Sequence, residues 1–110
     1  MEANLFEHSN VMDFCSIIEY SANGIISKRV LQKTNGNVSL FSFDQDQKLS
    51  EHTAPFDALI QVIEGEAEIV IDGKPFAVKA GQSIIMPAGR PHAVNAVTRF
   101  KMLLTMIKES

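Results

Sequence analysis

The stretch GQSIIMPAGRPH, residues 81–92, decides how this chain of 110 residues folds. It joins a glycine turn, a short apolar strand, the corner Pro87-Ala88-Gly89 and one histidine, His92. Glycine supplies the positive φ of a tight turn, and proline suits a corner where no backbone donor is needed. A histidine directly after such a corner can be held at one end of a β-barrel, with its ring turned inward.

Turn signals on both sides of this stretch divide the chain into short β-rich segments. Three hairpin dipeptides tolerate positive φ at both positions: Asn23-Gly24, Asn35-Gly36 and Asp72-Gly73. Between the turns we expect strands over residues 25–31, 38–43, 58–63, 67–71, 76–78, 83–86, 92–97 and 100–107. Many short strands at close spacing predict an all-β sandwich or barrel rather than a parallel sheet covered by helices.

The length of the chain is typical of one domain with one core, so we expect a single domain over residues 1–110. Its barrel should span about residues 25–107. The preceding segment, residues 1–24, should be irregular, or form a short helix and a strand. Asn10 is a good N-cap residue, and we place the helix from Asn10 to about Ser16.

Composition and charge argue against several classes of partner. The formal net charge is −3 and the chain has no run of lysine or arginine, so we expect no nucleic acid and no anionic membrane as partner. The N-terminus lacks the pattern of a signal peptide, and no apolar stretch approaches the ~20 residues of a membrane helix. Cys15 is the single cysteine and lies among apolar residues, which predicts a small buried side chain. A chain that cannot form an internal disulfide fits a reducing, cytoplasmic compartment.

Two of the expected strands, residues 58–63 and 100–107, are apolar on both faces. A sheet that is buried on both faces in so small a chain needs a cover outside it. A second copy of the chain is the simplest cover, so we predict a homodimer. The alternative is that the N-terminal segment covers this face.

Residues 81–92 resemble the second motif of the cupin family. That motif reads glycine, five residues, proline, any residue, glycine, two residues and histidine, and this chain matches each of those positions. The family motif ends with asparagine four positions after the histidine. Here Ala96 occupies that position, and Asn95 lies one place early.

The stretch from His52 to Gly65 resembles the first cupin motif in a degraded form. Both of these residues fall on the motif. Ala54 replaces its second histidine, Ala58 replaces its glutamate, and Asp46 stands where its opening glycine would be. The resemblance covers roughly residues 38 to 107.

The resemblance implies a jelly-roll barrel, or double-stranded β-helix, that is often dimeric and holds a divalent metal ion with three histidines and a glutamate. Only His52 and His92 match these ligand positions, so a bound Fe, Mn, Ni or Zn ion would depend on these two imidazoles. Stable sites usually offer at least three protein ligands. Asp57 and Gln61 are the nearest candidates for a third ligand, but strand alternation turns both away from the barrel axis unless a bulge reverses them.

The same alternation places Ala54, Ala58 and Ile60 on the face of His52, which predicts a largely apolar site with two imidazoles. Methionines can line a soft pocket or simply fill the core. Arg90 can pair with an anionic ligand at the barrel mouth, or be a solvated surface charge. The predicted ligand-binding residues are His52, Ala54, Ala58, Ile60, Met86, Arg90, His92 and Met102.

Three functions are consistent with this pattern. The first is a module that binds a small organic molecule in the barrel. The second is a metal-dependent enzyme of the oxygenase or isomerase type, with His52 and His92 as metal ligands. The third is a structural protein with a vestigial pocket. The missing ligands favour the first function over the second.

Overall fold

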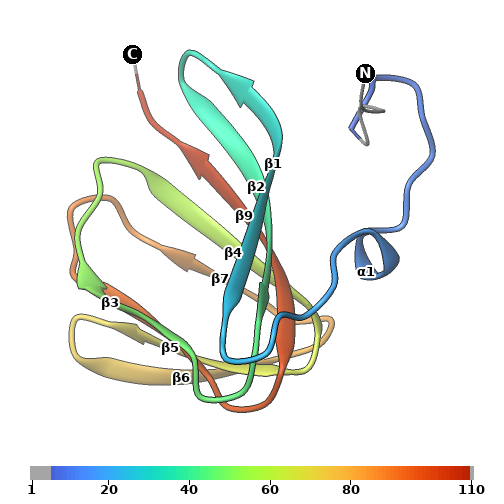
Figure 1. Cartoon of the computed structure of the whole chain (residues 1–110). Coiled ribbons are helices and arrows are strands. Elements are labelled where there is room, and N and C mark those ends of the chain that lie inside the picture. The colour runs from blue at the N-terminus through green and yellow to red at the C-terminus, as the bar shows by residue number, and fades with distance from the viewer. Residues whose placement is uncertain (1–5, 110) are drawn as a thin grey trace.

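The computed structural model describes residues 6–109, whose regular structure is almost entirely β (Figure 1). The strands form two antiparallel sheets, one with the order β1-β2-β9-β4-β7 and the other with the order β3-β8-β5-β6. The predicted all-β, jelly-roll class is therefore confirmed. The strands are β1 (Ile25–Lys33), β2 (Gly36–Phe43), β3 (Lys48–His52), β4 (Asp57–Glu64), β5 (Glu66–Ile71), β6 (Lys74–Lys79), β7 (Ser83–Met86), β8 (His92–Ala96) and β9 (Phe100–Ile107).

The sequence does not predict strand β3. Four of its five residues are polar and exposed, and only Leu49 is apolar and partly buried, so the strand carries no apolar alternation. It is a strand because it pairs with β8, in the register that sets Leu49 opposite Val94 and His52 opposite His92. The contacts that define β3 therefore come from a segment some forty residues away.

The single described helix, α1 (Phe14–Ile17), is shorter than expected and begins later. Asp13, not Asn10, is its N-cap, because the Asp13 carboxylate accepts a hydrogen bond from the backbone nitrogen of Cys15 at 3.0 Å. The expected start at Asn10 is therefore wrong. Among the described residues, no helix is long and apolar enough to cross a membrane.

The core lies between the two sheets. Ala58, Ile60 and Val62 alternate inward along β4 and are almost fully buried, as the period of two in the sequence predicts. The rings of Phe43 and Phe100 stack at 4.6 Å between centroids at one end of this core. Burial of such apolar surface is the main favourable contribution to the stability of the fold.

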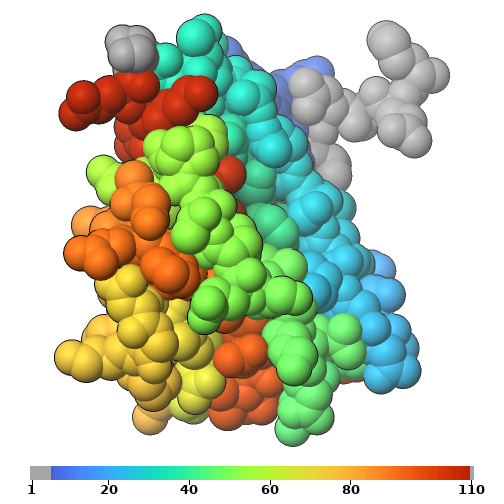
Figure 2. Space-filling view, turned by 90° about the vertical axis from the view of Figure 1, so that its left-hand side faces the viewer, coloured from blue at the N-terminus to red at the C-terminus, as the bar shows by residue number. Residues whose placement is uncertain are grey.

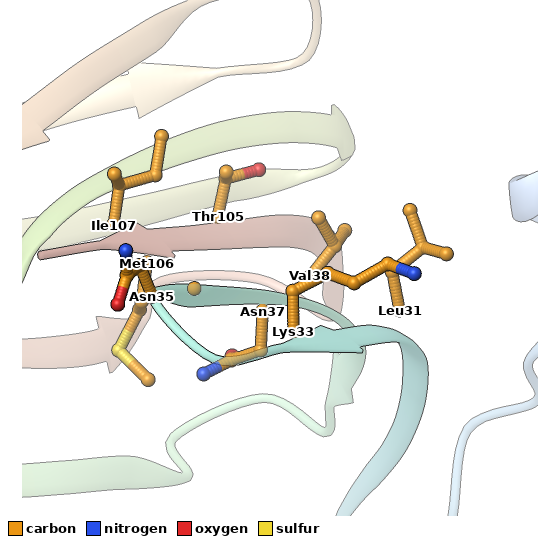
Figure 3. Close-up of a pocket in the computed structure, with 9 residues that line it drawn as sticks. Leu31, Lys33, Asn35, Asn37, Val38, Thr105, Met106 and Ile107 are labelled. Atoms are coloured by element: carbon orange, nitrogen blue, oxygen red, sulfur yellow. The ribbon is translucent and has the colours of Figure 1, made fainter. Parts of the chain in front are cut away.

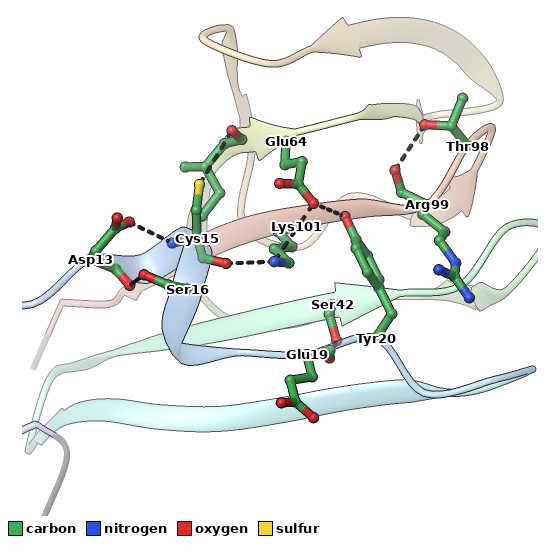
Figure 4. A network of polar contacts seen from close by, with 11 residues as sticks. Asp13, Cys15, Ser16, Glu19, Tyr20, Ser42, Glu64, Thr98, Arg99 and Lys101 are labelled. Carbon is green, nitrogen blue, oxygen red and sulfur yellow. Dashed lines mark hydrogen bonds and ion pairs between the residues drawn. The ribbon is translucent and has the colours of Figure 1, made fainter.

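The N-terminal segment covers part of the outer face of the five-stranded sheet. Ile18 is buried, and the backbone oxygen of Glu19 accepts a hydrogen bond from Ser42 Oγ at 2.7 Å. Lys101, on the neighbouring strand, donates to the backbone oxygen of Cys15 (Figure 4). The N-terminal segment, the expected alternative to a second copy of the chain, therefore covers that part of the sheet.

A polar network holds the N-terminal segment against the five-stranded sheet. Tyr20 donates a short hydrogen bond to Glu64, whose carboxylate lies 3.6 Å from Lys101 Nζ (Figure 4). The Lys101 ammonium also lies 4.9 Å from the centre of the Tyr20 ring, a favourable cation–π arrangement. Burial and the hydrogen bond to Glu64 raise the pKa of Tyr20, so its hydroxyl stays protonated and keeps donating.

Another part of the outer face remains open. A groove of about 300 Å³ runs along β1, β2 and the end of β9, and its walls include Leu31, Val38, Thr105 and Ile107 (Figure 3). The Ile107 side chain is largely exposed. The homodimer predicted from the apolar outer face stays a prediction.

Candidate functional site

A small chamber of about 50 Å³ lies between the two sheets. Strands of both sheets wall it with apolar side chains, and its polar lining comes from two histidines. Figure 2 shows the face of the molecule where the chain near residue 52, in green, lies beside the chain near residue 90, in orange. The lining residues are Leu49, His52, Ala54, Ala58, Ile60, Met86, His92, Val94, Met102, Leu104 and Met106.

The two imidazoles meet because β3 and β8 pair antiparallel. His52 ends β3, His92 begins β8, and the two residues are register partners. Their Nε2 atoms lie 3.2 Å apart, with ring centroids at 4.4 Å and the ring planes inclined at 72°. Two residues that are forty positions apart in the sequence therefore form one polar pair.

The second nitrogen of each ring lies beside a backbone carbonyl. His52 Nδ1 lies 2.8 Å from the backbone oxygen of Ser50, and His92 Nδ1 lies 3.2 Å from the backbone oxygen of Arg90. A carbonyl oxygen only accepts hydrogen bonds, so each of these contacts requires a hydrogen on Nδ1, and the contact between the two Nε2 atoms requires one on Nε2 of either ring. Two neutral rings carry two such hydrogens, so they satisfy two of the three contacts at a time.

His92 is the buried member of the pair, with 5% of its surface exposed, whereas His52 is exposed at the rim. Burial lowers the pKa of His92, and the nearby His52 lowers it further, because both disfavour the charged ring. The hydrogen bond to the Arg90 carbonyl acts in the opposite direction and is the smaller effect. His92 is therefore neutral at pH 7.

Most of the predicted ligand-binding residues line this chamber: Ala54, Ala58, Ile60, Met86 and Met102 do so together with the histidine pair. Their role in binding stays a prediction.

Arg90 is placed differently from the other predicted site residues. Its guanidinium lies 3.6 Å from the Asp72 carboxylate, both side chains are substantially exposed, and Arg90 does not line the chamber. A contact between Arg90 and an anionic ligand remains an expectation about the molecular surface outside the chamber.

The structure also places the two candidates for a third metal ligand. Asp57 and Gln61 are exposed on β4, and neither lines the chamber. The Asp57 carboxylate instead accepts a hydrogen bond from the backbone nitrogen of Ala88 at 2.9 Å. Within residues 6–109 no group of three or more histidine, cysteine or acidic side chains could hold a metal ion. The donor set here is thus two imidazoles, which does not fit a divalent ion held by three or four protein ligands.

The predicted set lacks four residues of the lining. Val94, Leu104 and Met106 had a usable signal, because they share the inward parity of His92 and Met102 on the same strands. Leu49 had no such signal, because the sequence does not predict the strand that contains it.

Comparisons with known proteins agree with this architecture. The sequence profile of the cupin domain matches residues 39–108. A conserved protein of unknown function from Streptococcus pyogenes has a similar structure, with a TM-score of 0.91 and 36% identity over 97% of this chain and 94% of that one. A cupin 2 conserved barrel domain protein from Leptotrichia buccalis has a TM-score of 0.83 and 42% identity, over 86% of this chain and 46% of that one.

One curated relative also matches. It is a Streptomyces cyaneus protein named polyketide synthase CurC, 30% identical over 60 residues. The match covers 54% of this chain and only 39% of that protein.

Proposed function

This chain belongs to the cupin family, and we propose that it binds a small, mainly apolar organic molecule in the chamber between its two sheets. One observation carries the proposal: a chamber with apolar walls has its polar atoms gathered in a single pair, His52 and His92. Sites for small molecules commonly combine an apolar lining with a few convergent polar groups that orient the ligand.

The dimensions of the chamber restrict its ligand. A site needs roughly 10–15 Å³ on this measure to hold one water molecule, so about 50 Å³ admits a group of only a few heavy atoms. Three methionines, Met86, Met102 and Met106, contribute to the walls. Methionine side chains are flexible and polarisable, so a somewhat larger ligand can be accepted when they change rotamer.

The methionines also provide the test. We would label the methionine methyl groups with carbon-13 and titrate the protein with a set of small apolar fragments. A ligand in the chamber should shift the methyl signals of Met86, Met102 and Met106. It should leave that of Met12, in the N-terminal segment, unchanged.

A matched pair of variants locates the binding. Ala54→Leu narrows the rim of the chamber and should abolish the shifts, whereas Ala77→Leu, at an exposed position of β6, should preserve them. Shifts that persist unchanged in Ala54→Leu, or the absence of any shifting fragment, would contradict the proposal.

A metal-dependent enzyme of the oxygenase or isomerase type is the second candidate. Its support is the convergence of two Nε2 atoms, and a neutral imidazole nitrogen is a suitable metal ligand. Against it stands the donor set, which lacks the third ligand of a stable site. Metal analysis of protein purified without a histidine tag separates the two functions. Stoichiometric Fe, Mn, Ni or Zn that is lost in both His52→Ala and His92→Ala would favour the enzyme.

A further inference from the structure

Four side chains that carry metal-binding atoms come together in the chamber. His52 and His92 belong to the four-stranded sheet, Met86 and Met106 belong to the five-stranded sheet, and all four line the same small space. The corner of residues 87–91 joins Met86, the last residue of β7, to His92, the first residue of β8. Imidazole and thioether groups therefore enter the chamber from opposite sheets.

Hydrogen bonds fix this corner to the segment that joins β3 and β4. The backbone nitrogen of Gly89 donates to the Ala54 oxygen at 2.8 Å, and that of Ala88 donates to the Asp57 carboxylate at 2.9 Å. These bonds hold the start of β8 close to the start of β4. The histidine pair is thereby placed at the end of the chamber where β4 begins.

Both methionines are direct neighbours of Ala58, the second residue of β4. In the register of the five-stranded sheet, Met86 lies opposite Ala58 on one side and Met106 lies opposite it on the other. Opposite residues of antiparallel strands point to the same face. Met106 accordingly points to the other side of β9 from Thr105 and Ile107 (Figure 3). The small Ala58 side chain leaves room for both thioethers at this end of the chamber.

We propose that these four side chains bind one Cu(I) ion, through Nε2 of His52 and His92 and the sulfur atoms of Met86 and Met106. Two nitrogens that are 3.2 Å apart can both lie about 2.0 Å from one ion, with an angle of roughly 105° at the metal. Each Nδ1 lies beside a backbone carbonyl, which is the second contact that a metal-binding histidine usually makes.

An ion would also remove a shortage of hydrogens in the histidine pair. Two neutral rings carry two hydrogens for three contacts, two with backbone carbonyls and one between the Nε2 atoms. With an ion on both Nε2 atoms, each ring keeps its hydrogen on Nδ1, where a carbonyl accepts it. The ion replaces the contact between the rings, and each remaining contact then has its hydrogen.

The chemistry of the donors selects a soft ion with a single charge. Thioether sulfur, which is soft and uncharged, favours Cu(I), whereas zinc sites are built from thiolate, imidazole and carboxylate groups. Among the described residues that line the chamber, none is acidic. One positive charge costs less to bury without an anionic partner than two. The imidazole pair alone does not fit a divalent ion, but with two thioethers it completes a site for Cu(I).

Silver provides the probe, because Ag(I) is soft and singly charged like Cu(I) and does not change its oxidation state. We would titrate silver nitrate at pH 7.5, without chloride, into protein with carbon-13-labelled methionine methyl groups. Cys15→Ser removes the free thiol, which would otherwise compete for the ion. One equivalent should shift the methyl signals of Met86 and Met106 and leave that of Met12 unchanged. Zn(II) should bind about tenfold more weakly or less.

Leucine variants separate the ligands from the rest of the lining. Met86→Leu and Met106→Leu nearly conserve volume and should each lower the affinity for Ag(I) about tenfold or more. Met102→Leu is the matched control. Met102 also lines the chamber but lies opposite Val62, about 13 Å along β9 from Met106, so this variant should keep the affinity. His52→Phe should lose affinity as the methionine ligands do. Titration of Cu(I) without oxygen, against a chromogenic chelator, should give the same order.

Three results would overturn the proposal: no methyl shift at one equivalent of Ag(I), unchanged affinity in both Met86→Leu and Met106→Leu, or Zn(II) binding as tight as that of Ag(I). The inference goes beyond the proposed function and does not depend on it. An organic molecule would compete with the ion for the methionine side chains, so the fragment titration is made on metal-free protein and tests the proposed function separately.

Discussion

Substitution of Gly65 by alanine should destabilise the protein far more than the same substitution at Gly73. Gly65 lies between β4 and β5, where the chain passes from the five-stranded sheet to the four-stranded sheet. Both glycines have φ of +77°, so both substitutions place an L-residue in the left-handed region. Their surroundings differ: a Cβ atom at Gly73 meets nothing within 4 Å, whereas one at Gly65 lies 2.0 Å from the Arg99 backbone oxygen.

The magnitude follows from this contrast. The left-handed conformation costs an alanine roughly 1–2 kcal/mol, and this is the whole expected effect of Gly73→Ala. At Gly65 the added atom also lies 2.9 Å from Cα and Cβ of Phe100, which is fully buried. Because these neighbours are backbone and core atoms, β9 must shift, and we expect about 3 kcal/mol of additional strain. That sum is a large part of the roughly 5–15 kcal/mol that stabilises a typical domain.

Urea unfolding followed by far-UV circular dichroism measures both effects in the same units. Gly65→Ala should have a free energy of unfolding about 3 kcal/mol below that of Gly73→Ala, with a melting temperature lower by about 10 °C or more. Equal stabilities for the two variants, within about 0.5 kcal/mol, would refute the argument from close approach. The glycine of the first motif would then be needed only for its positive φ.

Three further predictions concern residues outside the chamber. The hydrogen bond from Arg99, with two from backbone nitrogens, lowers the pKa of Asp44 from 3.8 to about 2. Asp44 therefore stabilises the fold at pH values above about 4, and this contribution is lost as the pH falls from about 4 to about 2. Asp44→Asn should flatten that part of the stability curve in urea titrations, and an unchanged slope would contradict the assignment. Lys101→Met leaves the Cys15 carbonyl without this donor and should cost about 1–3 kcal/mol, with faster hydrogen exchange around α1, while Lys79→Met at an exposed site should do neither. Ile107→Asp, in the outer groove, should convert the predicted homodimer to monomer in sedimentation equilibrium, and a wild-type protein that is already monomeric would exclude the dimer.

Much of the fold could be predicted because its signals are local. The period of two along β4 places Ala58, Ile60 and Val62 on one face, and the structure buries all three. Asp72-Gly73 forms the expected turn between β5 and β6, with positive φ at both residues. The helix start was misplaced because Asn10 and Asp13 are both good caps, and only the backbone contacts around Asp13 select between them.

Strand alternation and turn chemistry depend on neighbouring residues, so the sequence alone determined an all-β barrel and the inward parity of the alanines and methionines. The register between strands distant in the sequence is decided by the packing of whole sheets. Only the tertiary structure could set His52 opposite His92, bring their Nε2 atoms to 3.2 Å, and place Arg90 beside Asp72 rather than in the chamber. The contacts of the two rings depend on the same packing, because it positions the backbone carbonyls that lie beside their Nδ1 atoms.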